Sequence, residues 1–276
     1  MAGLIDFDST ISDIGYDPAI ARACFESFGT ACRLSEGDAF FAEDEKSEAM
    51  YLLLEGEVRL FRGVRVLDIV RSGEIFGEMA AIRGKPRTAW AVARKPCKAL
   101  ALNRLEFQEA IRATPEFALM LMRIILGRLR LTSAYLIKTG RLKYSGGTHD
   151  KIFDKEQVQD LASSMRTCRM AALPKDTVIM REGENGASMY VVLSGRVSVS
   201  IGETLVEQVG IGGMFGEMAL VSELPRAASA VALTDVRLLP ISHTDFMSLV
   251  QNQSEFAVSL LKSVATRLAR QTVRAV

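Results

Sequence analysis

The chain of 276 residues has a formal net charge of +1, and 49% of its residues are hydrophobic while 24% are charged. This length favours about two domains with their own cores, and the composition excludes a disordered chain. The near-neutral net charge gives no general electrostatic attraction to nucleic acid. The chain has only two histidines, which are too few to favour a zinc site or a Ser-His-Asp triad. We therefore predict no catalytic residue, no metal site and no nucleic-acid partner.

The sequence also indicates that the chain does not associate with a membrane. No apolar run approaches the ~18 residues of a membrane span, and the N-terminus lacks the charged start and apolar core of a signal peptide. The four cysteines have no metal-finger spacing, which suits buried thiols in a reducing compartment. A cytoplasmic protein is expected.

In chain order, the first predicted element is a helix opened by Pro18, with Ala21, Cys24 and Phe25 on its apolar face. From Leu34 the pattern changes to short β-rich runs, LSEGDAFF, AMYLLLEGEVRLF and VRVLDIV, broken by glycines or acidic turns. Such runs are typical of an antiparallel barrel or sandwich. From Phe107 onward, apolar residues recur at steps of three and four, which predicts a long amphipathic helical region.

The second half repeats this order without a gap. Matching residues lie 139 positions apart throughout, as in Tyr51 and Tyr190, Gly56 and Gly195, Gly73 and Gly212, and Phe107 and Phe246. A constant offset through strands, turns and helices indicates two copies of one domain. The stretch KTGRLKYSGGTHD, with Gly146 and Gly147, is the predicted join, which gives domains 1–142 and 143–276. The stretch KIFDKEQVQDLASSM is predicted to form the helix that opens the second copy.

The best-repeated stretch is FGEMAAIRGKPRTAWAV at 76–92, which returns as FGEMALVSELPRAASAV at 215–231. Its glycines, Gly77 and Gly216, allow a sharp turn and a close approach of the backbone to a ligand. Its arginines, Arg87 and Arg226, can form paired charge-assisted bonds to a phosphate or carboxylate. The pattern predicts an anion site that occurs twice.

Each glycine is followed by an acid, Glu78 or Glu217, which cannot bind an anion. A carboxylate beside an anion site is best explained as an acceptor of hydroxyl protons, as from a ribose. An internal salt bridge between the Glu and the Arg of each copy is the structural alternative.

Phe-Gly-Glu followed by Pro-Arg-x-Ala resembles the phosphate-binding cassette of the cyclic nucleotide-binding domain family. The stretch MREGENGASMYVVLSGRVSV, at 180–199, resembles the turn and hairpin ahead of that cassette. The resemblance implies an α+β fold of two tandem β-rolls (double-stranded β-helices, jelly-roll-like), each flanked by helices. The first copy has Asp44 where the second has Gly183, so we expect its first turn to be built differently.

By this resemblance, the arginines would bind the phosphate and the two glutamates the ribose 2′-hydroxyl. The implied ligand-binding residues are Gly77, Glu78, Met79, Ala80, Pro86, Arg87 and Thr88 in the first copy, and Gly216, Glu217, Met218, Ala219, Pro225, Arg226 and Ala227 in the second. Thr88 permits cAMP or cGMP, whereas Ala227 accompanies cAMP. The stretch LRLTS resembles a segment of the catabolite activator protein that contacts adenine, which implies Thr132 and Ser133 as base contacts in the first copy, one of them from the same or a partner subunit.

The expected function is a cytoplasmic sensor of cyclic nucleotides, cAMP or cGMP, and not an enzyme. The helical region after each cassette, 104–137 or 243–276, would close over the purine and signal to a protein partner or within a homodimer. The alternative is a structural or regulatory interaction subunit, an adaptor or a kinase-regulatory-like protein, with one or both pockets vestigial. A DNA-reading module is not expected because the second helical region ends at Val276, and the basic residues of that region are expected on its wet face: Lys262, Arg267, Arg270 and Arg274.

Overall fold

The computed structural model describes residues 15–142, 151–165, 169–222 and 224–275, with side chains described through Thr272. The fold divides into two compact units, Met1–Ile124 and Ile125–Val276, and the division falls inside helix α4 (Pro115–Lys138). The predicted join with Gly146 and Gly147 lies outside the described residues. The domain boundary at residues 142 and 143 therefore stays a prediction.

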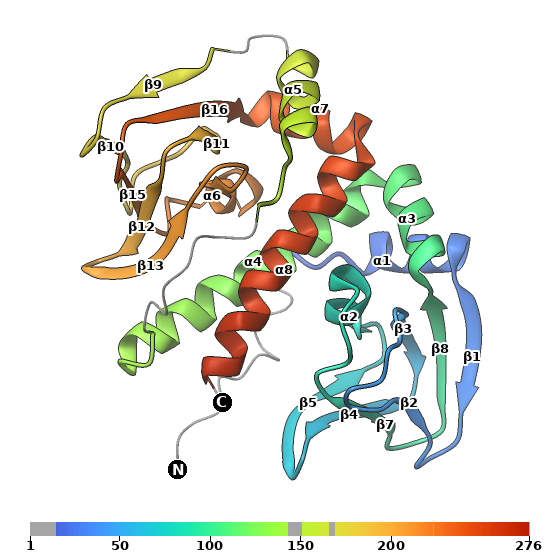
Figure 1. Ribbon diagram of the computed structural model, residues 1–276. Helices are drawn as coiled ribbons and strands as arrows, with labels where there is room; N and C mark the ends of the chain where they lie inside the picture. Colours follow the sequence, from blue (N-terminus) through green and yellow to red (C-terminus); the bar gives the residue numbers. More distant parts are fainter. Residues whose placement is uncertain (1–14, 143–150, 166–168, 223, 276) are drawn as a thin grey trace. The chain divides into compact units, whose positions relative to one another are not determined.

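The first unit contains two four-stranded antiparallel sheets, with strand orders β1-β8-β3-β6 and β2-β7-β4-β5 (Figure 1). Short helices and the start of α4 accompany them. The elements ahead of α4 are α1 (Pro18–Phe28), β1 (Thr30–Leu34), β2 (Ala39–Phe41), β3 (Met50–Glu55), β4 (Glu57–Arg62), β5 (Arg65–Arg71), β6 (Ile75–Phe76), α2 (Glu78–Arg83), β7 (Trp90–Ala93), β8 (Cys97–Leu102) and α3 (Arg104–Ala113).

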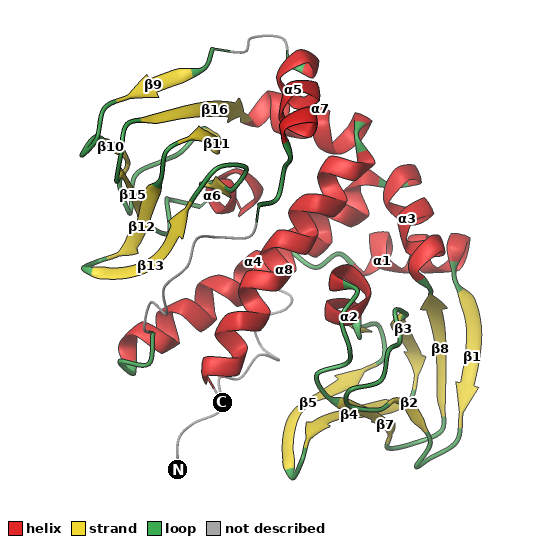
Figure 2. Ribbon diagram, in the orientation of Figure 1, coloured by secondary structure: helices red, strands yellow, loops and turns green. Residues whose placement is uncertain are grey.

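The second unit has the same topology, with sheets β9-β16-β11-β14 and β10-β15-β12-β13 (Figure 2). Its elements after α4 are α5 (Lys155–Ser164), β9 (Ala171–Leu173), β10 (Val178–Met180), β11 (Ser188–Ser194), β12 (Val197–Ile201), β13 (Thr204–Val209), β14 (Met214–Phe215), α6 (Glu217–Ser222), β15 (Ser229–Ala232), β16 (Val236–Ser242), α7 (His243–Asn252) and α8 (Ser254–Ala275). The predicted α+β class and the tandem β-rolls are confirmed.

Local sequence signals explain where several elements begin. Pro18 is at the start of α1, and the Asp17 side chain accepts from the backbone N–H of Ala19 at 2.9 Å. Helix α5 begins with a capping box in which Asp154 and Gln157 satisfy each other's backbone N–H groups. The sequence predicts both helices.

Each cassette is anchored by an aromatic pair in the sheet. Tyr51 of β3 lies opposite Phe76 of β6 with ring centroids 5.1 Å apart, and Tyr190 of β11 lies opposite Phe215 of β14 at 5.2 Å. Such cross-strand stacking stabilises the pairing of the short strand that leads into the cassette. The Phe of Phe-Gly-Glu is therefore a core residue in both copies.

The long helical region predicted after each sheet is two helices, α3 and α4 or α7 and α8. The chain leaves the helical conformation at Thr114 (φ −135°, ψ 79°) and at Gln253 (φ −131°, ψ 84°). Pro115 disfavours a helical Thr114, but no proline follows Gln253. What the two breaks share is an edge-to-face aromatic contact across them, Phe107 with Phe117 and Phe246 with Phe256. We attribute the break to this packing.

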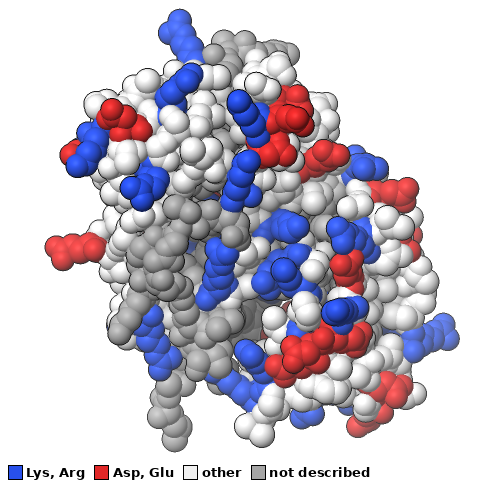
Figure 3. Space-filling model, in the orientation of Figure 1, with Lys and Arg blue, Asp and Glu red and all other residues white. Residues whose placement is uncertain are grey.

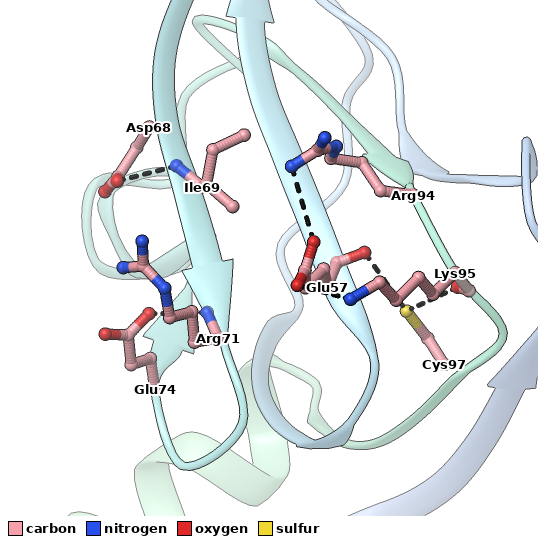
Figure 4. A network of polar contacts seen from close by, with 8 residues as sticks. All are labelled: Glu57, Asp68, Ile69, Arg71, Glu74, Arg94, Lys95 and Cys97. Atoms are coloured by element: carbon pink, nitrogen blue, oxygen red, sulfur yellow. Dashed lines mark hydrogen bonds and ion pairs between the residues drawn. The ribbon is translucent and has the colours of Figure 1, made fainter.

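The surface carries charges of both signs. Lys and Arg side chains are interspersed with Asp and Glu over the face drawn in Figure 3. In the first unit, Glu57 accepts from Lys95 at 2.6 Å and from Arg94 at 3.3 Å, and it joins β4 to the turn before β8 (Figure 4). The bond from Lys95 holds the pKa of the Glu57 carboxyl below its ordinary value. Among the described residues, no helix combines the length and hydrophobicity needed to cross a membrane.

Candidate functional site

The two cassettes begin with a glycine in the left-handed region. Gly77 has φ 76° and immediately precedes α2, and Gly216 has φ 84° and immediately precedes α6. A Cβ atom on Gly77 would lie 2.8 Å from Arg87 Nη1, and one on Gly216 would lie 2.8 Å from Arg226 Nη1. Glycine is required at both positions by the backbone conformation and by the approach of the arginine.

Arg87 is enclosed by the first β-roll, with 2% of its surface exposed. Its Nη1 donates to the carbonyl oxygen of Gly77 at 2.8 Å, and its Nη2 donates to the carbonyl of Ala49 at 2.5 Å and to Ser47 Oγ at 2.8 Å. The guanidinium lies over the ring of Phe41, with its carbon 3.9 Å from the ring centroid. Its Nε is buried and has no hydrogen-bond partner among the described residues.

Arg226 occupies the same place in the second β-roll and is 5% exposed. Its Nη1 donates to the carbonyl of Gly216 at 2.8 Å, and its Nη2 donates to the carbonyl of Ser188 at 2.5 Å. Gly186 stands where the first copy has Ser47, and a Cβ atom there would lie 2.0 Å from Arg226 Nε. The first copy therefore adds a hydroxyl contact to its arginine, whereas the second makes room for the guanidinium.

A turn ahead of each cassette holds the backbone of the arginine. Asp44 N–H donates to the carbonyl of Arg87 and Gly183 N–H to that of Arg226, both at 2.9 Å. Asp44 adopts φ 63° and Gly183 adopts φ 81°. The expectation that the two turns differ is wrong, because aspartate is among the residues that tolerate the left-handed region.

Neither buried guanidinium has a carboxylate partner within the described parts of the chain; the partners given above are carbonyl and hydroxyl oxygens. Burial lowers the pKa of both arginines, and nearby acidic and phenolic groups oppose that shift only in part. A buried cation without a counter-charge is costly, and an anion at this place would offset that cost. The structural alternative, a salt bridge between the Glu and the Arg of each cassette, is not the arrangement found.

The glutamate that follows each glycine is also buried, Glu78 at 7% and Glu217 at 1% exposure. Glu217 Oε1 accepts from Arg267 Nη1 of α8 at 2.6 Å. Arg267 Nη2 also donates to the carbonyl of Met214 at 2.7 Å. The carboxylate of Glu217 is thereby held in one orientation.

A cavity of about 640 Å³ adjoins the second cassette. This volume is within the range of small-molecule sites. All seven residues predicted for the second copy line it, namely Gly216, Glu217, Met218, Ala219, Pro225, Arg226 and Ala227. The cassette, α8, the second half of α4 and residues of β10, β12 and β13 line it, and every lining residue belongs to the unit Ile125–Val276.

The residues predicted for the first copy are placed by the first β-roll. Glu78, Ala80 and Arg87 are buried, Gly77 and Met79 are half-buried, and Pro86 and Thr88 are exposed. Thr132 and Ser133, predicted as base contacts in the first copy, are buried in the unit Ile125–Val276. Ser133 lines the cavity of the second cassette, and Thr132 is not part of its lining.

Sequence reasoning missed the residue that orients Glu217. Arg267 was expected on the wet face of the last helix, but its side chain is 10% exposed and pairs with Glu217. Lys262 and Arg270 are exposed as expected, and Arg274 lies beyond the described side chains. The spacing of the basic residues does not predict that Arg267 pairs with Glu217, because one helical face can carry both solvent-exposed and paired cations.

Comparison with known families matches residues 31–114 and 171–253 to the cyclic nucleotide-binding domain. These two segments make up more than half of the chain and contain both cassettes. The chain belongs to this family. It carries two cyclic nucleotide-binding domains in tandem.

Several curated proteins with cyclic nucleotide-binding domains are similar to the chain. A cyclic nucleotide-gated potassium channel of Rhizobium etli is 37% identical over 116 residues, 42% of this chain and 32% of the channel. A cAMP-dependent protein kinase regulatory subunit of Eremothecium gossypii is 27% identical over 221 residues, 79% of this chain and 43% of that subunit. The cGMP-dependent protein kinase 2 of Mus musculus is 28% identical over 241 residues, 85% of this chain and 29% of the kinase. The chain spans less than half the length of each.

Among solved structures, the regulatory domain of Toxoplasma gondii PKA with cAMP has a TM-score of 0.33 and 21% identity, covering 89% of this chain and 95% of that one. The N-terminal domain of a transcriptional regulator from Streptomyces coelicolor A3(2) has a TM-score of 0.37 and 29% identity, covering 48% of this chain and 92% of that one.

Proposed function

We propose that this protein is a cytoplasmic sensor that binds cAMP at two cyclic nucleotide-binding cassettes and signals through the helices that follow them. The observation that carries the proposal is the buried guanidinium of Arg87 and of Arg226, each held by carbonyl oxygens and without a carboxylate partner among the described residues. A cyclic phosphate supplies the missing negative charge and accepts bonds from the arginine.

The other predicted residues take their roles from this placement. Glu78 and Glu217 would accept from the ribose 2′-hydroxyl, and the glycines, with Ala80 and Ala219, would let the backbone approach the ligand. Thr88 keeps cGMP as the alternative ligand of the first site, whereas Ala227 offers no hydroxyl in the second. The relatives described above include proteins named for cAMP and for cGMP dependence, which supports a cyclic nucleotide as the ligand class.

The signal would be a shift between two arrangements of the helices. The breaks at Thr114 and Gln253 separate a short helix beside the sheet from the long helix that follows, and such a break can act as a hinge. The output would be changed contacts with a protein partner or a second copy of the chain. No catalytic role is proposed for any residue.

Thermal unfolding with added nucleotide tests the proposal. A ligand at about a hundred times its dissociation constant stabilises the folded state by about 2.7 kcal/mol, which for a protein of this size raises Tm by about 5 to 10 °C. We expect such a rise with cAMP and none in the double variant Arg87→Ala, Arg226→Ala. No shift with either cAMP or cGMP, at concentrations that stabilise a known binder, would disprove the proposal.

Gly216→Ala should weaken ligand binding at the second site as well as stability. The left-handed backbone costs an alanine about 1–2 kcal/mol, and the new Cβ atom would displace the guanidinium of Arg226. Gly202→Ala is the matched control, because Gly202 has φ 54° and a Cβ atom added there would meet no atom within 4 Å. Urea unfolding should show a loss for both variants, and calorimetric titration should show weaker binding for Gly216→Ala alone. Equal affinities would contradict this prediction.

A further inference from the structure

The cavity of the second cassette is completed by a helix that begins before the second β-roll. Leu129, Arg130, Ser133 and Ala134 of α4 line it together with Arg267, Arg270 and Gln271 of α8. Arg130 Nη1 lies 3.5 Å from the carbonyl oxygen of Pro225, the residue that precedes Arg226 in the cassette. The second half of α4 is therefore part of the same compact unit as this site.

Within the cavity wall, α4 and α8 meet in a buried polar contact. Ser133 Oγ donates to Gln271 Oε1 at 2.8 Å, and the two residues are 6% and 9% exposed (Figure 1 shows the two helices). The two residues do not occupy equivalent positions in the two copies. With the offset of 139, Gln271 corresponds to Thr132 and not to Ser133. A hydroxyl from one copy and an amide from the other thus face the same cavity.

The hydrogen-bonding capacity of this pair is only partly used. Gln271 Oε1 is engaged by Ser133, which leaves the amide Nε2 to donate and the lone pairs of Ser133 Oγ to accept. An acceptor beside a donor matches the edge of adenine that carries the N6 amino group, a donor, and N7, an acceptor. Amide side chains bind this edge with two hydrogen bonds. Ala227, next to the arginine, has no polar side-chain atom with which to read the base.

We infer that Ser133 and Gln271 together read the 6-amino edge of adenine in the second site, with Ser133 supplied by the helix of the first copy. The inference rests on the proposed function and deepens it. It also reassigns Ser133 from the first site to the second. Because α4 is continuous from Pro115 to Lys138, a base bound by Ser133 contacts the same helix that follows the first β-roll.

The test uses the full chain with Arg87→Ala, so that only the second site binds. Calorimetric titration compares cAMP with the cyclic nucleotide whose purine lacks the 6-amino group. We expect cAMP to bind about threefold to tenfold more tightly, as one hydrogen bond implies. Ser133→Ala should remove this preference, because the hydroxyl oxygen is the acceptor for the 6-amino group. Gln271→Met should lower the affinity for both nucleotides, because both carry the N7 acceptor. Thr266→Val is the control, because Thr266 lies on α8, bonds the carbonyl of Lys262 and does not line the cavity.

Hydrogen exchange provides a second readout that does not depend on how well the lining variants fold. In the Arg87→Ala protein, cAMP should slow exchange in residues 125–138 as well as in the second cassette, because both would contact the ligand. Undiminished preference for cAMP in Ser133→Ala, undiminished affinity in Gln271→Met, or no protection of 125–138 would overturn the inference and leave the proposed function standing. Absence of any nucleotide binding to the parent protein would overturn the proposed function itself.

Discussion

Replacing Arg226 by alanine is expected to lower the affinity of the second site for cAMP by about a hundredfold or more. A buried, hydrogen-bonded charge pair that loses one partner costs about 3 kcal/mol or more, because the remaining charge stays desolvated. Arg226 is 5% exposed, and the carbonyls of Gly216 and Ser188 hold its guanidinium in place, where the proposed phosphate would bind. Calorimetric titration should therefore give one nucleotide per chain instead of two.

The first site is the internal control for this experiment, because Arg87→Ala should remove binding there and spare the second site. Arg226→Lys separates charge from geometry. Lysine keeps the positive charge but cannot bond both carbonyls and a phosphate with one planar fork, so we expect an affinity between wild type and alanine. Two nucleotides bound per chain of Arg226→Ala at wild-type affinity would exclude the assigned role.

Arg267→Met is expected to destabilise the second unit by about 3–5 kcal/mol, because it leaves the carboxylate of Glu217 buried without its partner. Glu217 is 1% exposed, and the 2.6 Å bond from Arg267 joins α6 to α8. Urea unfolding followed by circular dichroism should show the loss. The fluorescence of Trp90, the single tryptophan and a residue of the first unit, provides the reference.

A double variant distinguishes a lost charge pair from lost packing. Glu217→Gln combined with Arg267→Met removes both charges, so its stability should recover much of what Arg267→Met loses. A double variant as unstable as the sum of the two single variants would show that the pair does not interact. If Arg267→Met lowers the free energy of unfolding by less than about 1 kcal/mol, the pair contributes no more than a solvent-exposed ion pair, and the prediction is wrong.

The sequence by itself determined the repeat, the fold class and the centre of each site. These follow from local signals: strand runs between glycine turns, helices with Pro18 and Asp154 at their starts, and a glycine that must turn where an arginine approaches. The arginines were identifiable because a guanidinium can form paired bonds to a phosphate or carboxylate, and each arginine follows a repeated glycine turn at the same spacing.

Where the helical region breaks was not determined by local signals alone. Pro115 marks the first break, but Gln253 has no proline after it and adopts nearly the same conformation as Thr114. Both breaks are accompanied by a contact between aromatic rings ten residues apart in sequence. That contact depends on how the short helix and the long helix pack against each other. The spacing of apolar residues in the sequence does not predict this packing.

Only the tertiary structure decided which residues share the second site. Arg267 lies fifty residues after Glu217, and Ser133 lies 138 residues before Gln271, so no spacing rule joins either pair. Their proximity results from the packing of α4 and α8 in one unit with the second β-roll. The sequence specified the cassette residues proposed to bind a phosphate, because they are local. It could not specify the residues proposed to contact the base, because those lie on helices brought together by folding.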